Sequence, residues 1–124
     1  MKVISFEDLQ VWKDSRILVK SIYQLTANGK FNKDFGLREQ IQRASVSIMN
    51  NIAEGFERNN NKEYIKFLGY SKGSAGEVRS MLYVATDLGY ISQDSFNTYY
   101  QMAINIITQL SNFIKYLKSS SIKK

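Results

Sequence analysis

Apolar side chains recur at intervals of three and four residues through most of this chain, which is the spacing of an amphipathic α-helix. Residues that end helices or form tight turns interrupt this pattern at Asn28-Gly29, at the three asparagines that begin with Asn59, and at Gly89. The pattern predicts an all-α protein whose helices span residues 6–28, 33–59, 61–88 and 92–119. A length of 124 residues suits a single domain that covers residues 1–124.

The second predicted helix carries an ordered row of polar residues beside its apolar row. A surface helix usually places its charges opposite its apolar face. A polar row that borders the apolar one favours polar groups held within or at the edge of a helix-packing interface. The alternative is an ordinary solvated flank, and spacing alone gives the two interpretations similar weight. The polar row consists of Gln40, Arg43, Ser47, Asn51, Glu54 and Arg58.

The third predicted helix has a strip of small residues, namely Gly69, Gly73, Gly76 and Ser80. Each glycine inside a helix costs about 0.5–1 kcal/mol relative to alanine. We expect close approach of another backbone along this strip to compensate for that cost.

The fourth predicted helix is apolar over about half of its circumference, which is more than one side of a four-helix bundle needs. The residues that widen this apolar sector are Tyr100, Ile104, Ile107 and Ile114. They are our candidates for the interface of a homo-oligomer.

Four motifs stand out along the chain, namely FEDLQVW from Phe6, GLREQIQRA from Gly36, RASVSIMNNIAEG from Arg43 with Arg58 after it, and GSAGE from Gly73. Together they resemble a known family, the four-helix-bundle proteins encoded in 23S rRNA intervening sequences. The resemblance implies an antiparallel up-down four-helix bundle that assembles into a ring-like homo-oligomer, often a pentamer. The family's genetic setting also implies an association with RNA.

The resemblance adds Gly55, Gly73, Ser74 and Glu77 to the polar row as signature positions with a structural or interface role. Antiparallel packing of the second and third helices could bring Glu77 near Arg43 or Asn51. We therefore expect partly buried charges that pair between these two helices.

The composition removes most catalytic and metal-binding chemistry. The chain has no histidine and no cysteine, so it lacks the usual general bases, thiol nucleophiles and nitrogen or sulfur metal ligands. The glycine-rich segment that ends in GSAG lacks the Gly-Lys-Ser/Thr ending of a phosphate-binding loop. A carboxylate pair such as Glu54 with Glu77 could hold magnesium through oxygen, but neutralisation by Arg43 and Arg58 is the interpretation that we favour. We expect no catalytic residue, no metal, no cofactor and no enzymatic activity.

The net charge of +6, from 17 Lys and Arg against 11 Asp and Glu, favours anionic partners such as RNA or another nucleic acid. From Ser92 onward the only acid is Asp94, so the C-terminal end is locally basic. The alternative is an oligomeric scaffold for a protein partner, in which the lysines serve solubility. The candidates for phosphate contacts are Arg79, Lys115, Lys118, Lys123 and Lys124.

The sequence also bears on where the protein acts. No apolar run approaches the roughly 20 residues that cross a bilayer, and the N-terminus has no signal-peptide pattern. A chain without cysteine is compatible with a reducing compartment. We expect a cytoplasmic protein that has no membrane partner.

Overall fold

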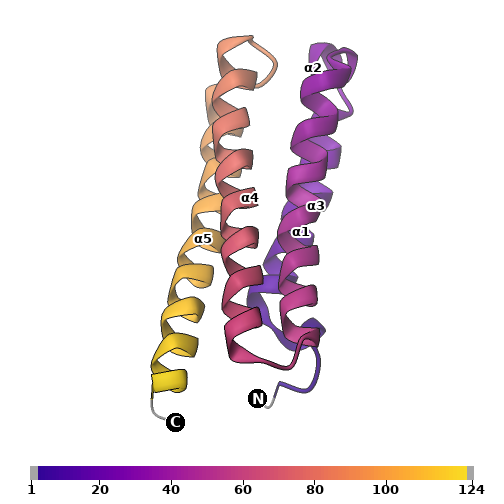
Figure 1. The fold of residues 1–124 in the computed structure, drawn as a ribbon. Helices are drawn as coiled ribbons and strands as arrows, with labels where there is room; N and C mark the ends of the chain where they lie inside the picture. The colour runs from indigo at the N-terminus through magenta and orange to yellow at the C-terminus, as the bar shows by residue number, and fades with distance from the viewer. Residues whose placement is uncertain (1–2, 123–124) are drawn as a thin grey trace.

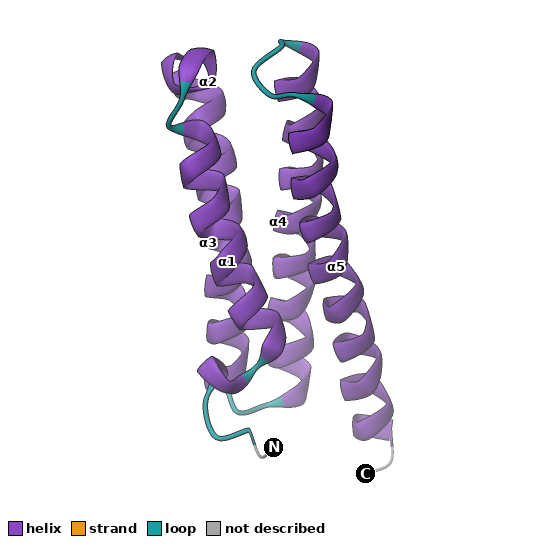
Figure 2. Cartoon of the chain, turned by 180° about the vertical axis from the view of Figure 1, so that it is seen from behind, coloured by secondary structure: helices purple, strands orange, loops and turns teal. Residues whose placement is uncertain are grey.

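The computed structural model describes residues 3–122, and these residues are helical apart from short connections (Figure 1). The four long helices pack up and down, each antiparallel to the next along the chain (Figures 1 and 2). η1 and the end of α5 lie at one end of the bundle, while α2 and the α4–α5 turn lie at the other. None of the helices among the described residues is both long enough and apolar enough to span a membrane. The elements are η1 (Phe6–Asp8), α1 (Gln10–Thr26), α2 (Gly29–Lys33), α3 (Phe35–Glu57), α4 (Asn61–Asp87) and α5 (Gln93–Ile122).

The predicted turns end the helices where the sequence places them. Asn59 adopts a φ of 54°, and the side chain of Asn60 then accepts a hydrogen bond from the backbone N–H of Glu63 at 3.0 Å, which caps α4. Gly89 has a φ of 74° directly after α4, a conformation that favours glycine. Ser92 accepts a bond from a backbone N–H in the first turn of α5 at 3.1 Å. The predicted boundaries of the third and fourth helices are therefore confirmed to within a few residues.

The start of the first helix differs from the prediction. The Asp8 carboxylate accepts hydrogen bonds from the backbone N–H groups of Ile4 and Ser5 at 2.9 and 3.1 Å. These bonds close the short 3-10 helix η1 and lower the pKa of Asp8. Leu9 is then extended, with a ψ of 125°, so α1 begins at Gln10 rather than at Phe6.

α2 is not among the predicted helices, because a five-residue helix is too short to show a period. Its Phe31 is wholly buried, and its ring centroid lies 5.4 Å from that of Tyr90 in the α4–α5 turn. The Tyr90 hydroxyl donates to the carboxylate of Asp34 at 2.9 Å, and the other oxygen of Asp34 caps α3 by accepting from the Leu37 N–H at 3.1 Å. These contacts tie the two helix connections together at one end of the bundle.

The hydrophobic core runs along the axis where the four long helices meet. Buried hydroxyls in this core bond to backbone carbonyl groups, as Ser15 does to the Val11 oxygen at 2.7 Å. The largest fully buried residues from the long helices, each with at most 1% of its surface exposed, include Leu18, Ile22, Ile41, Ile48, Ile52, Leu68, Val78, Leu82, Ile106 and Leu110.

The closest helix pair is α3 with α4, and small inward-facing residues bring the two together. The Ser71 hydroxyl donates to the main-chain oxygen of Ile48 at 2.6 Å, across the interface. A Cβ atom added to Gly55 would lie 2.9 Å from the Phe67 Cβ and 3.3 Å from the Tyr64 carbonyl oxygen. The two backbones approach this closely only because position 55 has no side chain.

The strip of Gly69, Gly73 and Gly76 does not make such a contact. No atom of another residue lies within 4 Å of a Cβ added at any of the three, apart from chain neighbours and their own helix backbone. The expectation of close backbone approach along this strip is therefore wrong within the chain. The strip lies on a different face of α4 from the buried Ser71 and Ala75, which face the core.

These two environments predict opposite effects of the same substitution. Gly55→Ala should lower the free energy of unfolding by about 1–3 kcal/mol, because the new methyl group would force α3 and α4 apart. Gly73→Ala should raise it by about 0.5–1 kcal/mol, because alanine favours the helix and has open space there. Chemical denaturation followed by circular dichroism measures both. Destabilisation by Gly73→Ala would contradict the open strip and indicate that a second chain packs on it.

Candidate functional site

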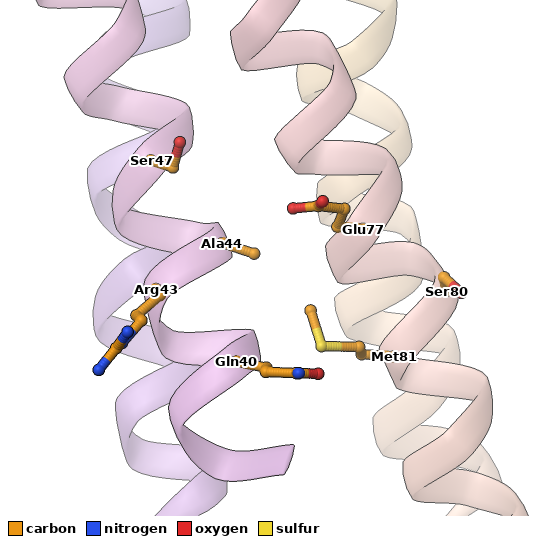
Figure 3. Close-up of a pocket in the computed structure, with 7 residues that line it drawn as sticks. All are labelled: Gln40, Arg43, Ala44, Ser47, Glu77, Ser80 and Met81. Carbon is orange, nitrogen blue, oxygen red and sulfur yellow. The ribbon is translucent and has the colours of Figure 1, made fainter. Parts of the chain in front are cut away.

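Four of the signature positions, Gln40, Arg43, Ser47 and Glu77, line a groove between α3 and α4 of about 470 Å³ (Figure 3). Ser47 is the centre of the hydrogen bonds beside it. The Ser74 hydroxyl donates to the Ser47 hydroxyl at 2.9 Å, and the Asn51 amide donates to both the hydroxyl and the carbonyl oxygen of Ser47 at 2.9 Å. Ser47, Asn51 and Ser74 therefore lie half-buried at the edge of the helix-packing interface. The other members of the polar row are exposed, as on a solvated flank, namely Gln40, Arg43, Glu54 and Arg58. The residues that line the groove are Gln40, Arg43, Ala44, Ser47, Glu77, Ser80 and Met81.

Arg43 and Glu77 do not form the predicted pair. Both residues are exposed, and the described part of the chain contains no ion pair between them. Figure 3 shows Ala44 and Glu77 directed into the space between the helices, while Arg43 points away from Glu77. The contact of Ser47 with Ser74 sets a register that brings Ala44 opposite Glu77, and Arg43 lies about 100° further round the helix. The expectation of partly buried, paired charges is wrong for these two residues.

The remaining charged pair of the row lies within one helix. Arg58 Nε is 3.1 Å from a Glu54 carboxylate oxygen, and both side chains are about half exposed, so the pair contributes little stability. The Arg58 guanidinium also lies 4.9 Å from the ring centre of Phe67 on α4. In the register that Ser47 defines, Glu54 and Glu77 lie roughly 15 Å apart along the bundle axis, too far to share a magnesium ion.

A second cluster lies on the α4–α5 side of the bundle. Arg79 Nη2 donates to the Tyr100 hydroxyl at 2.8 Å, and the guanidinium carbon lies 5.1 Å from the centre of the Tyr100 ring. The Nε atom of Arg79 is buried and has no hydrogen-bond partner within the described residues. Arg79 is thus half-buried and held by Tyr100. The prediction of Arg79 as a phosphate contact had assumed a side chain fully exposed to solvent.

Two lysines extend this cluster into a row, which we call the basic seam. Lys72 lies seven residues before Arg79, so the two share one stripe of α4. Lys118 lies eighteen residues after Tyr100, which is five full turns, so those two share one stripe of α5. Because Arg79 contacts Tyr100, both stripes border the line where α4 meets α5. Lys72 and Lys118 are exposed.

Lys115 adds a further exposed cation about 60° round α5 from Lys118. Arg79, Lys115 and Lys118 are among the predicted phosphate contacts, whereas Lys72 is not. The seven-residue spacing from Lys72 to Arg79 could have revealed it. Lys123 and Lys124 lie outside the described residues.

The residues that were predicted to form an oligomer interface are largely used inside the bundle. Tyr100, Ile107 and Ile114 are half-buried and pack against the chain's own core. Ile104 is also half-buried, and together with Met102 it lines a hollow of about 640 Å³ on the outer side of α5. The wide apolar sector of α5 therefore supports self-association less than its width suggested.

Hydrogen bonds within the seam shift the pKa values of Tyr83 and Tyr100 in opposite directions. The hydrogen bond from Arg79 is the main cause that lowers the pKa of Tyr100, and a hydrogen bond from Tyr83 adds to it. The pKa of Tyr83 is raised, chiefly because its hydroxyl donates to Tyr100.

Burial raises the pKa of Tyr64 far above its usual range, and the Tyr64 hydroxyl has no hydrogen-bond partner in the described chain.

The family comparison places this geometry in context. The sequence pattern of the 23S rRNA-intervening sequence protein family matches residues 7–112. The chain belongs to this family. The resemblance that the sequence motifs indicated is therefore confirmed.

A solved structure supports the fold. The chain is similar to a protein of unknown function from the S23 ribosomal protein family of Bacteroides thetaiotaomicron, with a TM-score of 0.78 against its crystal structure. The two sequences are 24% identical, and the match covers 85% of this chain and 98% of that one. At this identity the likeness shows the fold alone. No protein with a curated description matches the chain.

The cause of the low pKa of Tyr100 can be tested directly. Arg79→Met should raise the pKa of Tyr100, because the phenolate loses its hydrogen-bonded cation. An alkaline titration of absorbance at 295 nm measures this, with Tyr100→Phe identifying the contribution of Tyr100 by difference. The first tyrosine to ionise should disappear in Tyr100→Phe. An unchanged titration curve in Arg79→Met would contradict the pairing.

Proposed function

We propose that this member of the family is a non-enzymatic protein that binds RNA through phosphate contacts along the basic seam and works as a homo-oligomer. The observation that carries the proposal is the absence of acids beside this row of cations. α5 has a single acid, Asp94, in its first turn at the far end from Lys118. On α4, Glu77 is the only acid between Lys72 and Tyr83, and it faces the α3–α4 groove instead.

Phosphate contacts fit this chemistry better than base readout does. Lys72, Lys115 and Lys118 are long, exposed cations on rigid helices, and they gain affinity from the counterions that the nucleic acid releases. Lysine side chains meet phosphates as point charges, and such contacts carry little sequence information. The family's setting in rRNA genes favours RNA over other polyanions as the partner.

Assembly of several subunits would repeat the basic seam and so increase the number of phosphate contacts with one RNA strand. One subunit offers three exposed seam lysines, whereas a ring offers the same row several times along one strand. The groove between α3 and α4 is the surface that we propose for self-association, and a pentamer is the assembly that the resemblance favours. Arg43 and Glu77 carry opposite charges there, and neither has an ionic partner among the described residues. A second copy could supply both partners.

Binding of RNA to the seam can be separated from the effect of net charge. The triple change of Lys72, Lys115 and Lys118 to glutamine should weaken RNA binding at least tenfold at low salt. Each subunit should also lose about 2 from the slope of log affinity against log salt, because three contacts at roughly 0.7 each disappear for a single strand. Fluorescence anisotropy with labelled RNA over a salt series measures both quantities.

A matched control removes the same charge from another face. Changing Lys13, Lys20 and Lys30 to glutamine also lowers the net charge from +6 to +3, but these exposed lysines lie on α1 and α2. The control should retain most of its affinity. Equal losses in both triple variants would indicate attraction by net charge alone. If the unaltered protein binds no RNA at low salt, the proposal fails and the protein scaffold is left as the alternative.

The proposed groove contact predicts a charge-swap result. Arg43→Glu alone and Glu77→Arg alone should each lower the mass of the assembly, because like charges then face one another across the interface. The double variant should restore it, because the pair is re-formed with its polarity reversed. Light scattering coupled to size-exclusion chromatography measures the mass. A mass of 14.3 kDa for the unaltered protein at micromolar concentration would contradict self-association.

A further inference from the structure

One exposed aromatic side chain lies at the end of the basic seam nearer the α4–α5 turn. Tyr83 on α4 has 52% of its surface exposed, although its ring is held by two neighbours. Its centroid lies 4.9 Å from that of Phe96 and 5.9 Å from that of Tyr100. Phe96 is itself only 8% exposed and belongs to the core, so it anchors the cluster. Tyr83 is therefore a ring fixed in place that still presents half of its surface to solvent.

The surroundings of this ring are rigid, with Arg79 one turn before it on α4 and Asp87 one turn after it. Phe96 and Tyr100 stack with centroids 5.2 Å apart and an angle of 27° between their planes, and the Arg79 guanidinium lies over the Tyr100 ring. The Tyr83 ring borders the same α4–α5 line as Lys72, eleven residues earlier on the helix, or about three turns. A preorganised aromatic surface loses little conformational entropy when a flat partner covers it.

From this arrangement we propose that Tyr83 is a stacking site for an unpaired nucleobase of a single-stranded RNA whose phosphates follow the basic seam. This inference rests on the proposed function and specifies the form of RNA that the seam takes. Proteins that bind single strands without sequence preference combine a basic track with aromatic rings on which bases stack. Both parts are present here along one line of the surface. A base inside a duplex is already stacked on both faces, so the site discriminates against paired RNA.

The test compares single-stranded and double-stranded RNA of the same length. Tyr83→Ala should lower the affinity for the single strand about five- to hundredfold, because one base–aromatic stack is lost. The affinity for the duplex should stay within about twofold. Tyr83→Phe and Tyr83→Trp should both retain single-strand binding, because each keeps a flat ring. In Tyr83→Trp, binding of the single strand should also quench the fluorescence of the added indole. The quenching of Trp12, measured in the unaltered protein, is subtracted as the background.

A matched control tests whether any exposed tyrosine on the same helix has this effect. Tyr70 is also on α4 and is 51% exposed, but it packs edge-on against Phe67 away from the basic seam. Tyr70→Ala should leave both affinities unchanged. Thermal unfolding by circular dichroism shows whether each alanine variant remains folded.

The outcomes separate this inference from the proposed function. If Tyr83→Ala leaves single-strand binding intact, or if the lysine variants lose binding while Tyr83→Trp shows no quenching, the stacking site is wrong and phosphate binding stands. Equal losses for single strand and duplex would also overturn it. If the unaltered protein binds neither RNA at low salt, the proposed function fails and the stacking site fails with it.

Discussion

The close contact between α3 and α4 is the constraint on which the rest of this structure depends. It requires Gly55, where a methyl group would meet both Phe67 and the backbone at Tyr64. It also uses hydrogen bonds across the interface, from Ser71 to the Ile48 carbonyl group and between the hydroxyls of Ser74 and Ser47. These contacts fix the register of the two helices, and the register decides which side chains enter the groove and which point outward.

Periodicity predicts the helices well because it follows directly from which side chains are buried. The cap at Asn60, the left-handed Asn59 and the end of α4 beside Gly89 can all be predicted from local residue chemistry. α2 could not be predicted, because five residues are too few to show a period and Phe31 is buried only once the core has assembled around it. The start of α1 was predicted too early, because helical propensity continues from Phe6 without a break. The turn that Asp8 closes delays the helix to Gln10.

The candidate site was predicted less completely, because a helical pattern identifies a face but not what lies opposite it. Arg43 and Glu77 both line the groove, but the register of α3 and α4 sets Ala44 opposite Glu77, so within the described residues both charges are exposed and unpaired instead of forming a salt bridge. The spacing of the α4 glycines likewise identifies a face of the helix, but it does not show that this face meets open space. Lys72 joins the basic seam only once Arg79 is known to contact Tyr100. A surface that combines residues from two helices needs their relative placement, which spacing within one helix does not contain.

The central claim is that RNA lies along the α4–α5 side of the bundle, and lysine footprinting tests it most directly. The protein is acetylated with and without bound RNA, and the modification of each lysine is measured by mass spectrometry. The account predicts strong protection of Lys72, Lys115 and Lys118, with Lys13 and Lys20 on α1 modified to the same extent in both samples. Protection confined to α1, or equal protection of every exposed lysine, would contradict the account.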